Sequence, residues 1–321
     1  MGQERGGTIH VLGIDAGGTK TVCLLARADG TVLAEARGEG ANLQAVGELG
    51  VEKVLHQVME DAIGERPILP AVICLGIAGV DREDDAAVIR AVMRRIGAKA
   101  RVVVTNDALV ALVAGAGLGP GIVVIAGTGS IAYGHDGQGR AARAGGWGYI
   151  LGDEGSGYWI GRLALRAVVR EADGRGRPTA LTPLILRHFG VTKPQELVHE
   201  IYYRPMRPAA IAALARYVQV ARDEHDGVAG HLLDTAAREL AASAESVARQ
   251  LQLQREAFPF VLAGGILEAV PWLRDALRER LAEVAPAATV SVLQGEPAHG
   301  AVRLALEDAR GGVRLPAYAH P

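Results

Sequence analysis

The chain has 321 residues, of which 49% are hydrophobic and 22% charged, and its formal net charge is −2. This length predicts two domains or one large α/β unit. The near-neutral charge disfavours a protein that binds nucleic acid by electrostatic attraction. The start of the chain has no apolar signal-peptide core, and no apolar run approaches the roughly 20 residues that cross a bilayer. We therefore expect a soluble, cytoplasmic protein without membrane partners.

Glycine is unusually frequent, with 42 of the 321 residues, whereas about 7% is usual. The glycines fall in short clusters between apolar runs, where tight turns can meet ligands. The two cysteines, Cys23 and Cys74, each lie in an apolar, strand-like run. Two isolated cysteines make neither a disulfide framework nor a CxxC metal site, so we expect buried apolar side chains.

The first part of the chain predicts three antiparallel strands followed by alternating helices and strands. An apolar run at 9–14 precedes a glycine turn at 15–20, and Asp29-Gly30 divides the run 21–36 into a hairpin. Hydrophobic periodicity then switches between the helical and strand periods. The predicted elements are a helix at 49–63, a strand at 71–77, a helix at about 83–96, a strand at 100–104 and a helix from about 108.

At residue 121 the pattern of strand, Gly/Thr turn, strand, turn and strand begins again, about 110 residues after its first copy. This repetition predicts an internally duplicated fold. From 156 to about 255 the chain is mostly helical, most clearly at 232–251. The closing elements are a strand at 259–264, a helix at about 266–283, a strand at 288–293, a helix at 297–309 and a loosely ordered tail at 311–321.

The segment GIDAGGTKT, 13–21, runs from a strand through two glycines directly into a second strand. Backbone N–H groups in such a turn can point at phosphate oxygens, and Thr19, Lys20 and Thr21 add donors. Asp15, at the start of the turn, is placed to hold a magnesium ion directly or through water. The alternative is an ordinary hairpin whose glycines only relieve strain.

Two further glycine turns stand at comparable points of the pattern. AGTGS, 126–130, is a second strand–turn–strand, and in a duplicated fold the two turns would face each other across a cleft and grip one polyphosphate. VLAGGILEA, 261–269, is a strand, a Gly264-Gly265 pair and a helix. Glycines there would let a flat ring lie against the backbone, although such a turn is also a common packing feature.

Together these segments resemble the first phosphate motif, the second phosphate motif and the adenosine motif of the actin-like ATPase superfamily of sugar kinases, actin and the seventy-kilodalton heat-shock proteins. The closer resemblance is to the N-acetylglucosamine kinase branch, the BadF/BadG/BcrA/BcrD-type family. GGWGYILGDEGSGYWIG, 145–161, carries it, and TNDALVAL, 105–112, and PAHGAVRLAL, 297–306, also fit. The resemblance covers about residues 10–310.

The resemblance implies an α/β fold of two actin-like (ribonuclease H-like) domains with a cleft between them. We expect an N-terminal domain at 1–117 and a C-terminal domain with a helical insertion at 118–296. A C-terminal helix and tail, 297–321, is expected against the N-terminal domain. The resemblance also implies a homodimer.

The implied activity is that of a sugar kinase in amino-sugar metabolism, which transfers phosphate from ATP, with Mg²⁺, to the 6-hydroxyl of N-acetylglucosamine. Glucosamine, N-acetylmuramate and glucose remain alternative substrates. An iron–sulfur ATPase activator of an acyl-CoA dehydratase or reductase is a second alternative, but Cys23 and Cys74 are not placed to ligate a cluster. A non-enzymatic sugar sensor is a third, and an intact Asp107 counts against it. The zinc-bearing cysteine cluster of the other bacterial glucokinase-like family is absent.

The resemblance assigns the catalytic base to Asp107, which follows the strand RVVV at its carboxyl end, where ligands of α/β sheets bind. The alternative is that Asn106 or Asp107 merely caps the helix beginning at Ala108. Asp153 or Glu154 could likewise be first-turn acids that complement a helix dipole. Trp147 and Trp159 are expected to be packing residues.

The remaining site residues form two groups. The expected sugar-binding residues are Asn42, Asp81, Asn106, Gly129, Ser130, Gly145, Gly146 and Asp153. The expected nucleotide-binding residues are Gly17, Gly18, Thr19, Lys20, Gly127, Thr128, Gly264 and Gly265.

Overall fold

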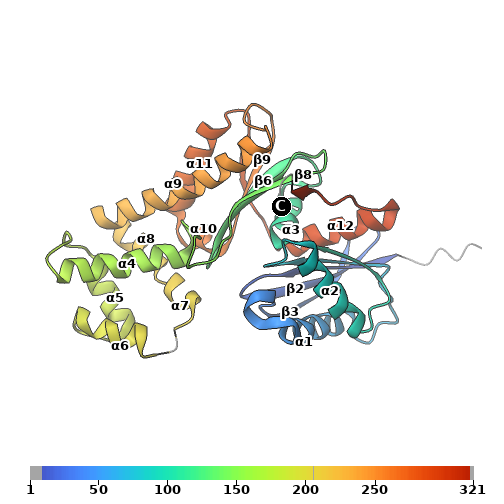
Figure 1. Cartoon of the computed structure of the whole chain (residues 1–321), viewed down its shortest axis with the longest axis horizontal. Coiled ribbons are helices and arrows are strands. Elements are labelled where there is room, and N and C mark those ends of the chain that lie inside the picture. Colours follow the sequence, from blue (N-terminus) through green and yellow to red (C-terminus); the bar gives the residue numbers. More distant parts are fainter. Residues whose placement is uncertain (1–8, 205, 319–321) are drawn as a thin grey trace, which may run out of the picture. The chain divides into compact units, whose positions relative to one another are not determined.

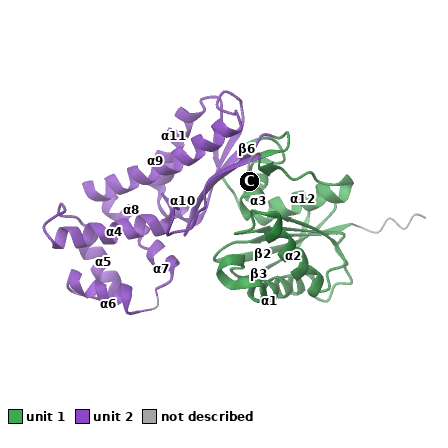
Figure 2. Ribbon diagram, viewed as in Figure 1, with its two compact units in different colours: residues 1–121, 137–140, 292–321 green, residues 122–136, 141–291 purple. Residues whose placement is uncertain are grey.

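The structure, a computed structural model, describes residues 9–204 and 206–318 (Figure 1). The chain divides into two units, each built on its own β-sheet (Figure 2). Unit 1 comprises the chain up to Gly121, residues 137–140 and the chain from Val292 onward, and unit 2 comprises Ile122–Asp136 and Ala141–Ser291.

The sheet of unit 1 has five strands in the order β3-β2-β1-β4-β5. Strand β1 pairs antiparallel with β2 and parallel with β4, and β4 pairs parallel with β5. The strands are β1 (His10–Ala16), β2 (Lys20–Arg27), β3 (Val32–Glu39), β4 (Val72–Ile77) and β5 (Arg101–Thr105).

Two pairs of helices pack on this sheet (Figure 1). Helices α1 (Leu43–Ile63) and α2 (Glu83–Arg95) contact each other and the strands β2, β3 and β5. Helices α3 (Asp107–Ala116) and α12 (Ala298–Gly311) contact each other and the strands β1 and β4. The last helix of the chain is therefore part of the first unit.

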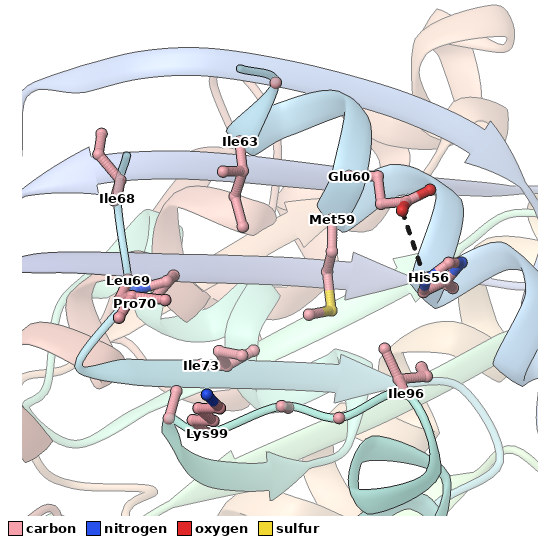
Figure 3. Close-up of a pocket in the computed structure, with 14 residues that line it drawn as sticks. His56, Met59, Glu60, Ile63, Ile68, Leu69, Pro70, Ile73, Ile96 and Lys99 are labelled. Carbon is pink, nitrogen blue, oxygen red and sulfur yellow. Dashed lines mark ion pairs between the residues drawn. The ribbon is translucent and has the colours of Figure 1, made fainter. Parts of the chain in front are cut away.

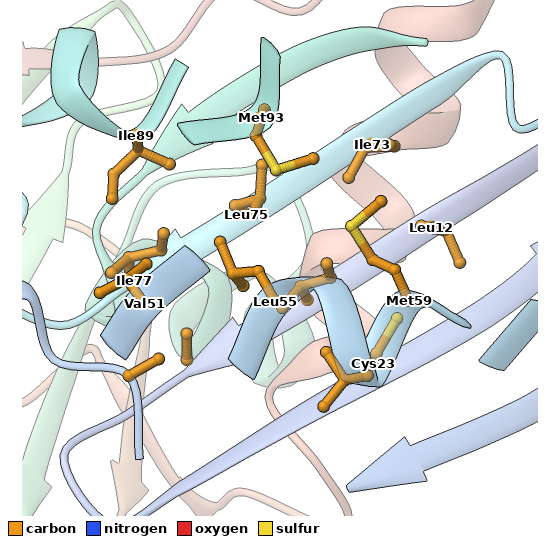
Figure 4. Close-up of a cluster of buried hydrophobic side chains, with 14 of the residues drawn as sticks. Leu12, Cys23, Val51, Leu55, Met59, Ile73, Leu75, Ile77, Ile89 and Met93 are labelled. Atoms are coloured by element: carbon orange, nitrogen blue, oxygen red, sulfur yellow. The ribbon is translucent and has the colours of Figure 1, made fainter. Parts of the chain in front are cut away.

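Apolar side chains from α1 and α2 meet those of the central strands in the core of unit 1 (Figure 4). Leu55 of α1 and Ile89 of α2 are fully buried against Leu12, Cys23 and Leu75 of the strands. Cys23 and Cys74 are buried, as predicted, and their thiols are free. Burial raises the pKa of the Cys23 thiol to about 12.

Glycine lets α12 approach its neighbours closely. A Cβ atom at Gly300 would lie 1.9 Å from the carbonyl oxygen of Val110 in α3. A Cβ atom at Gly13 of β1 would lie 2.4 Å from the backbone nitrogen of Val302. These two glycines therefore fix the helix against the sheet and against α3.

The sheet of unit 2 repeats the plan of the first. Its strands follow the order β10-β9-β6-β7-β8, which corresponds to β5-β4-β1-β2-β3, and β6 is parallel to β9 while β7 is antiparallel to β8. The predicted internal duplication is thus confirmed by strand order. The strands are β6 (Gly121–Ala126), β7 (Ser130–His135), β8 (Arg140–Gly145), β9 (Pro259–Ala263) and β10 (Thr289–Val292).

Helices make up most of the rest of unit 2. The long helix α9 packs against β7 and α11. The helices are α4 (Gly157–Ala172), α5 (Leu181–Phe189), α6 (Leu197–Tyr202), α7 (Pro208–Ala212), α8 (Ala215–Asp223), α9 (Gly227–Gln250), α10 (Gly265–Ala269) and α11 (Pro271–Val284), with a 3-10 turn at Pro194–Glu196.

Three expectations from the sequence need correction. The helix expected at 49–63 begins at Leu43, because Asn42 caps it, and it is interrupted at Gly47. The helix expected at 266–283 is two helices, because Pro271 starts a new one. The tail is not loosely ordered through Tyr318: Ala317–Tyr318 form the short strand β11, and the Ala317 N–H donates to the Gly139 carbonyl at 3.0 Å. Residues 319–321 lie outside the described residues.

Within the part of the chain that the structure describes, no helix combines the length and apolar character needed to span a bilayer.

Candidate functional site

Hydrogen bonds and close backbone packing hold one side of the first glycine turn, and its other side is exposed to solvent. The Gly17 N–H donates to the Lys20 carbonyl at 3.0 Å, and the Gly17 carbonyl accepts from the Ala41 N–H at 3.1 Å. A Cβ atom at Gly40 would lie 2.4 Å from the Gly18 carbonyl oxygen, so the end of β3 packs directly on the turn. Gly18, Thr19 and Lys20 are exposed. The turn can therefore receive a ligand on its exposed side.

Acidic side chains gather beside this turn. Asp15, the penultimate residue of β1, is 6% exposed. Its pKa is raised to about 8, chiefly by burial and also by the charges of Asp107 and Glu296, while Lys20 opposes the rise. Lys20 Nζ lies 2.7 Å from a Glu296 carboxylate oxygen. A buried carboxyl among other carboxyls is an environment that a bound cation would stabilise.

Asp107 is the first residue of α3, and one residue, Asn106, separates it from β5. Its pKa is raised to about 6, chiefly by burial and also by the negative charge of Asp81. The N-cap of the helix is Asn106, whose Oδ1 accepts the Leu109 N–H at 2.7 Å, while hydrogen bonds from the backbone N–H groups of Asp107 and Ala108 oppose the rise in the Asp107 pKa. The capping role that the sequence left open between Asn106 and Asp107 thus belongs to Asn106.

Asp81, Asn106 and Tyr318 form a hydrogen-bonded group in unit 1. The Tyr318 hydroxyl donates to Asp81 Oδ1 at 3.0 Å and accepts from Asn106 Nδ2 at 3.3 Å. Two expected sugar-binding side chains therefore share one tyrosine from the C-terminal tail. Sequence reasoning missed Tyr318, since no local pattern marks a residue that lies 212 positions from Asn106.

Asn42, the remaining expected sugar ligand of unit 1, is the N-cap of α1. Its Oδ1 accepts the N–H groups of Gln44 at 2.9 Å and Ala45 at 3.1 Å. A Cβ atom at Gly79, which has φ +83°, would lie 3.4 Å from this oxygen. The side-chain oxygen already accepts two hydrogen bonds, so a sugar contact would be made by the side-chain nitrogen, Nδ2.

The second glycine turn, in unit 2, is tied to the start of α4. The Gly127 N–H donates to the Gly129 carbonyl at 2.9 Å, and the Gly127 carbonyl accepts from Gly157 N–H at 2.9 Å. The Thr128 carbonyl accepts from Tyr158 N–H at 3.3 Å. A Cβ atom at Gly127 would meet nothing within 4 Å. As in the first turn, the backbone is supported by its own unit and a glycine stands in open space.

Asp153 is 7% exposed and has a positive φ of 58°. Burial raises its pKa, while hydrogen bonds from the backbone N–H groups of Ser130 and Gly148 oppose that shift. A Cβ atom at Gly129 would lie 2.6 Å from Asp153 Oδ2, so this glycine makes room for the carboxylate. The Ser130 hydroxyl donates to the Glu154 carbonyl at 2.8 Å.

The alternative that Asp153 and Glu154 belong to the first turn of a helix is wrong. Helix α4 begins at Gly157, and its cap is Ser156, whose hydroxyl accepts the Trp159 N–H at 3.2 Å. Asp153 is therefore a buried loop carboxyl of unit 2.

The loop before Asp153 is apolar and exposed. Gly145 and Gly146 both have positive φ, +76° and +70°, which suits glycine and few other residues. Trp147 is 62% exposed, contrary to the packing role expected of it, and its ring lies 5.0 Å from the Arg143 guanidinium carbon. Trp159, the other tryptophan of this motif, is half-buried.

The Gly264-Gly265 pair serves two different needs. Gly264 has φ +101°, and a Cβ atom there would lie 2.3 Å from the Ala126 carbonyl oxygen, so it packs the β9–α10 turn against the end of β6. Gly265 has nothing within 4 Å of its Cβ position. The packing interpretation therefore holds for Gly264, and only Gly265 leaves backbone accessible to a ligand.

A hollow of about 410 Å³ in unit 1 lies away from these residues (Figure 3). It is lined by the end of α1 and by the segments that enter β4 and β5, including Met59, Ile68, Ile73 and Lys99. It therefore lies at the amino ends of the parallel strands, whereas Asp81 and Asp107 follow their carboxyl ends. Among the residues described, no group of three or more His, Cys, Asp or Glu side chains is arranged to hold a metal ion.

Two proteins similar to this chain are named as kinases of amino sugars. The chain is 36% identical over 299 residues to an N-acetylmuramic acid/N-acetylglucosamine kinase from Clostridium acetobutylicum, covering 92% of this chain and 98% of that protein. It is 34% identical over 309 residues to an N-acetyl-D-glucosamine kinase from Dictyostelium discoideum, covering 92% and 97%.

A solved structure from Chromobacterium violaceum, described as a candidate N-acetylglucosamine kinase, matches with a TM-score of 0.70 and 31% identity. That match covers 93% of this chain and 99% of the other. The sequence model of the BadF/BadG/BcrA/BcrD ATPase family matches residues 12–305. The match spans both units and every site residue described above except Tyr318, and the chain belongs to this family.

Proposed function

We propose that the chain is an ATP-dependent kinase that phosphorylates the 6-hydroxyl of N-acetylglucosamine. The observation that carries this proposal is the pair of carboxyls with raised pKa, buried Asp15 and half-buried Asp107, in the unit that carries the exposed residues Gly18, Thr19 and Lys20. Phosphoryl transfer needs positioning, charge neutralisation and a proton acceptor. One carboxyl can serve the metal ion and the other can accept the proton.

In this proposal Asp107 is the general base that accepts the proton of the sugar hydroxyl. A base works best with a pKa near the operating pH, and the raised pKa of Asp107, about 6, agrees with that role. Asp15 would hold Mg²⁺, directly or through water, and the ion when bound would neutralise charge on the phosphates. The backbone N–H groups of Gly18 and Thr19, with Lys20 after release from Glu296, would bind phosphate oxygens.

Unit 2 would supply the remaining contacts. We assign Gly127 and Thr128 to the phosphates and Gly265 to the adenosine, with Gly264 shaping that turn. Asp153, beside Gly129 and Ser130, is our candidate for accepting hydrogen bonds from sugar hydroxyls, because a buried carboxylate that backbone N–H groups hold in place is a well-oriented acceptor. Gly145 and Gly146 would let the backbone approach the sugar. In unit 1 we assign Asn42, Asp81 and Asn106 to sugar binding.

The alternative activities differ in how well the chain supports them. Glucosamine, N-acetylmuramate and glucose differ from N-acetylglucosamine only at the second or third carbon, so they remain candidate substrates of the same site. An iron–sulfur activator is disfavoured, because Cys23 and Cys74 are buried in β2 and β4 and cannot reach a surface cluster.

A coupled assay of ADP release with a panel of these four sugars, ATP and Mg²⁺ tests the proposal. We expect the highest kcat/KM with N-acetylglucosamine and a 6-phosphorylated product. Turnover with none of the four sugars would contradict the kinase assignment, and a higher kcat/KM for another sugar would correct the substrate.

We also propose a cytoplasmic homodimer, and a monomeric mass in size-exclusion chromatography with light scattering would contradict the dimer.

A further inference from the structure

The C-terminal tail of unit 1 is fixed along its length before it reaches the candidate site. At the end of α12, buried Asp308 pairs with Arg101 of β5, and its Oδ1 accepts the Val313 N–H at 3.1 Å. Farther on, the Ala317 N–H donates to the Gly139 carbonyl at 3.0 Å. These contacts give Tyr318 a defined position rather than that of a loose chain end.

The Tyr318 hydroxyl joins two segments that each follow a parallel strand. Asp81 lies after β4, and Asn106 lies after β5. The hydroxyl donates to Asp81 Oδ1 at 3.0 Å and accepts from Asn106 Nδ2 at 3.3 Å. Because a phenol has one proton to donate and lone pairs to accept with, it can make both bonds at once.

Asn106 connects this group to the proposed base. Its Oδ1 caps α3 through the Leu109 N–H at 2.7 Å while its Nδ2 donates to Tyr318, so both ends of the amide are held. The next residue is Asp107. A side chain held at both ends fixes the backbone from which the Asp107 carboxyl projects, and small displacements of a catalytic group cost rate steeply.

We propose that Tyr318 is a positioning residue of the kinase: its hydroxyl ties Asp81 to Asn106 and so holds Asp107 in the geometry that accepts the sugar proton. This inference rests on the proposed function of Asp107. It assigns a catalytic contribution to a tail segment beyond the residues that the family model matches.

The test compares wild type with Tyr318→Phe, which removes only the hydroxyl. Tyr202→Phe is the matched control, because the Tyr202 side chain is 80% exposed. We expect Tyr318→Phe to lower kcat by about 10- to 100-fold with the KM for ATP unchanged. We also expect faster hydrogen exchange of the Leu109 amide in the first turn of α3, a readout that needs no turnover.

Two results would overturn the tyrosine's role while leaving the kinase intact. One is an active wild type with a Tyr318→Phe variant of unchanged kcat and unchanged exchange at Leu109, which would mean that the tail only stabilises the unit. The other is a lower KM for sugar with undiminished kcat, which would mean that Tyr318 competes with the sugar. A wild type that phosphorylates no sugar would instead overturn the proposed function, and the catalytic part of this inference with it.

Discussion

Asp107 begins α3, but Asn106 and not Asp107 caps the helix. We therefore expect Asp107→Asn to reduce kcat by about 10²–10⁴, the usual cost of losing a general base. Sugar affinity should change modestly, because an amide still hydrogen-bonds a hydroxyl. The melting temperature should not fall, and at neutral pH it should rise, because the amide removes a charge that the folded state disfavours. Steady-state kinetics and thermal unfolding of the same preparation measure all three quantities.

The control for this variant is its neighbour. Asn106→Ala removes the cap and should cost about 1 kcal/mol of stability, which thermal unfolding detects. If Asp107→Asn instead retained near-normal kcat, Asp107 would not be the base, and Asp153 and Asp81 would be the next carboxyls to test.

The charge of Asp81 should be visible in the pH dependence of the reaction. Burial and, secondly, the Asp81 carboxylate raise the pKa of Asp107 to about 6, so kcat/KM should fall as the pH drops below about 6. Asp81→Asn removes the like charge while keeping an oxygen that can accept from Tyr318. Its pH–rate profile should lose activity at a lower pH than wild type. A profile with the same midpoint would show that Asp81 does not act on the catalytic ionisation.

Substitutions in the glycine turns can distinguish a role in ligand binding from a role in folding. Gly127 has no positive φ and no neighbour within 4 Å of its Cβ position, so Gly127→Val should fold with a nearly unchanged melting temperature. The added side chain should still weaken ATP binding by at least tenfold, because it would occupy the space assigned to phosphate. Isothermal titration with ATP and with sugar measures the difference. Equal loss of both affinities would indicate a folding role.

Gly264→Val is the opposite case. Its φ of +101° and the approach of Ala126 make a side chain both strained and obstructed. Residues held in such backbone regions cost of order 1–3 kcal/mol. We therefore expect a clear loss of stability, measured by denaturant unfolding. An unchanged unfolding midpoint would show that the β9–α10 turn relaxes without cost.

The sequence predicts the elements well where the signals are local. The strand–turn–strand patterns around Gly17 and Gly127 and the helical period of α9 each depend on neighbouring residues, and all are confirmed. The site is less predictable because its contacts are distant in sequence. Lys20 pairs with Glu296, 276 residues away, and Asp81 with Tyr318, 237 residues away. Likewise, the choice between Asn106 and Asp107 as the cap depends on side-chain geometry that one local pattern cannot resolve.

At the scale of the whole molecule, three carboxyls with raised pKa values make the stability of the fold depend on pH. Burial raises the pKa values of Asp15, Asp107 and Asp153, so the folded chain keeps these protons at pH values where the unfolded chain has lost them. Stability therefore falls as the pH rises from the unfolded value of about 4 through each folded value. The lowered pKa values of His135 and His188 act in the other direction, but only below about pH 6.5.

Above neutrality Asp15, whose pKa is about 8, is the main source of the loss of stability with rising pH. We expect metal-free protein to lose about 1–2 kcal/mol of stability between pH 6.5 and 8.5, seen as a melting temperature lower by a few °C in EDTA. Asp15→Asn should remove this slope and melt higher than wild type at pH 8.5. Mg²⁺ with ATP should stabilise wild type but not the variant.

Asp29→Asn, at an exposed turn where hydrogen bonds from Thr31 lower the carboxyl pKa, should behave as wild type. Parallel slopes for wild type and Asp15→Asn would mean that Asp15 is already ionised in the fold, and its assignment as the buried acid that receives the metal would fail.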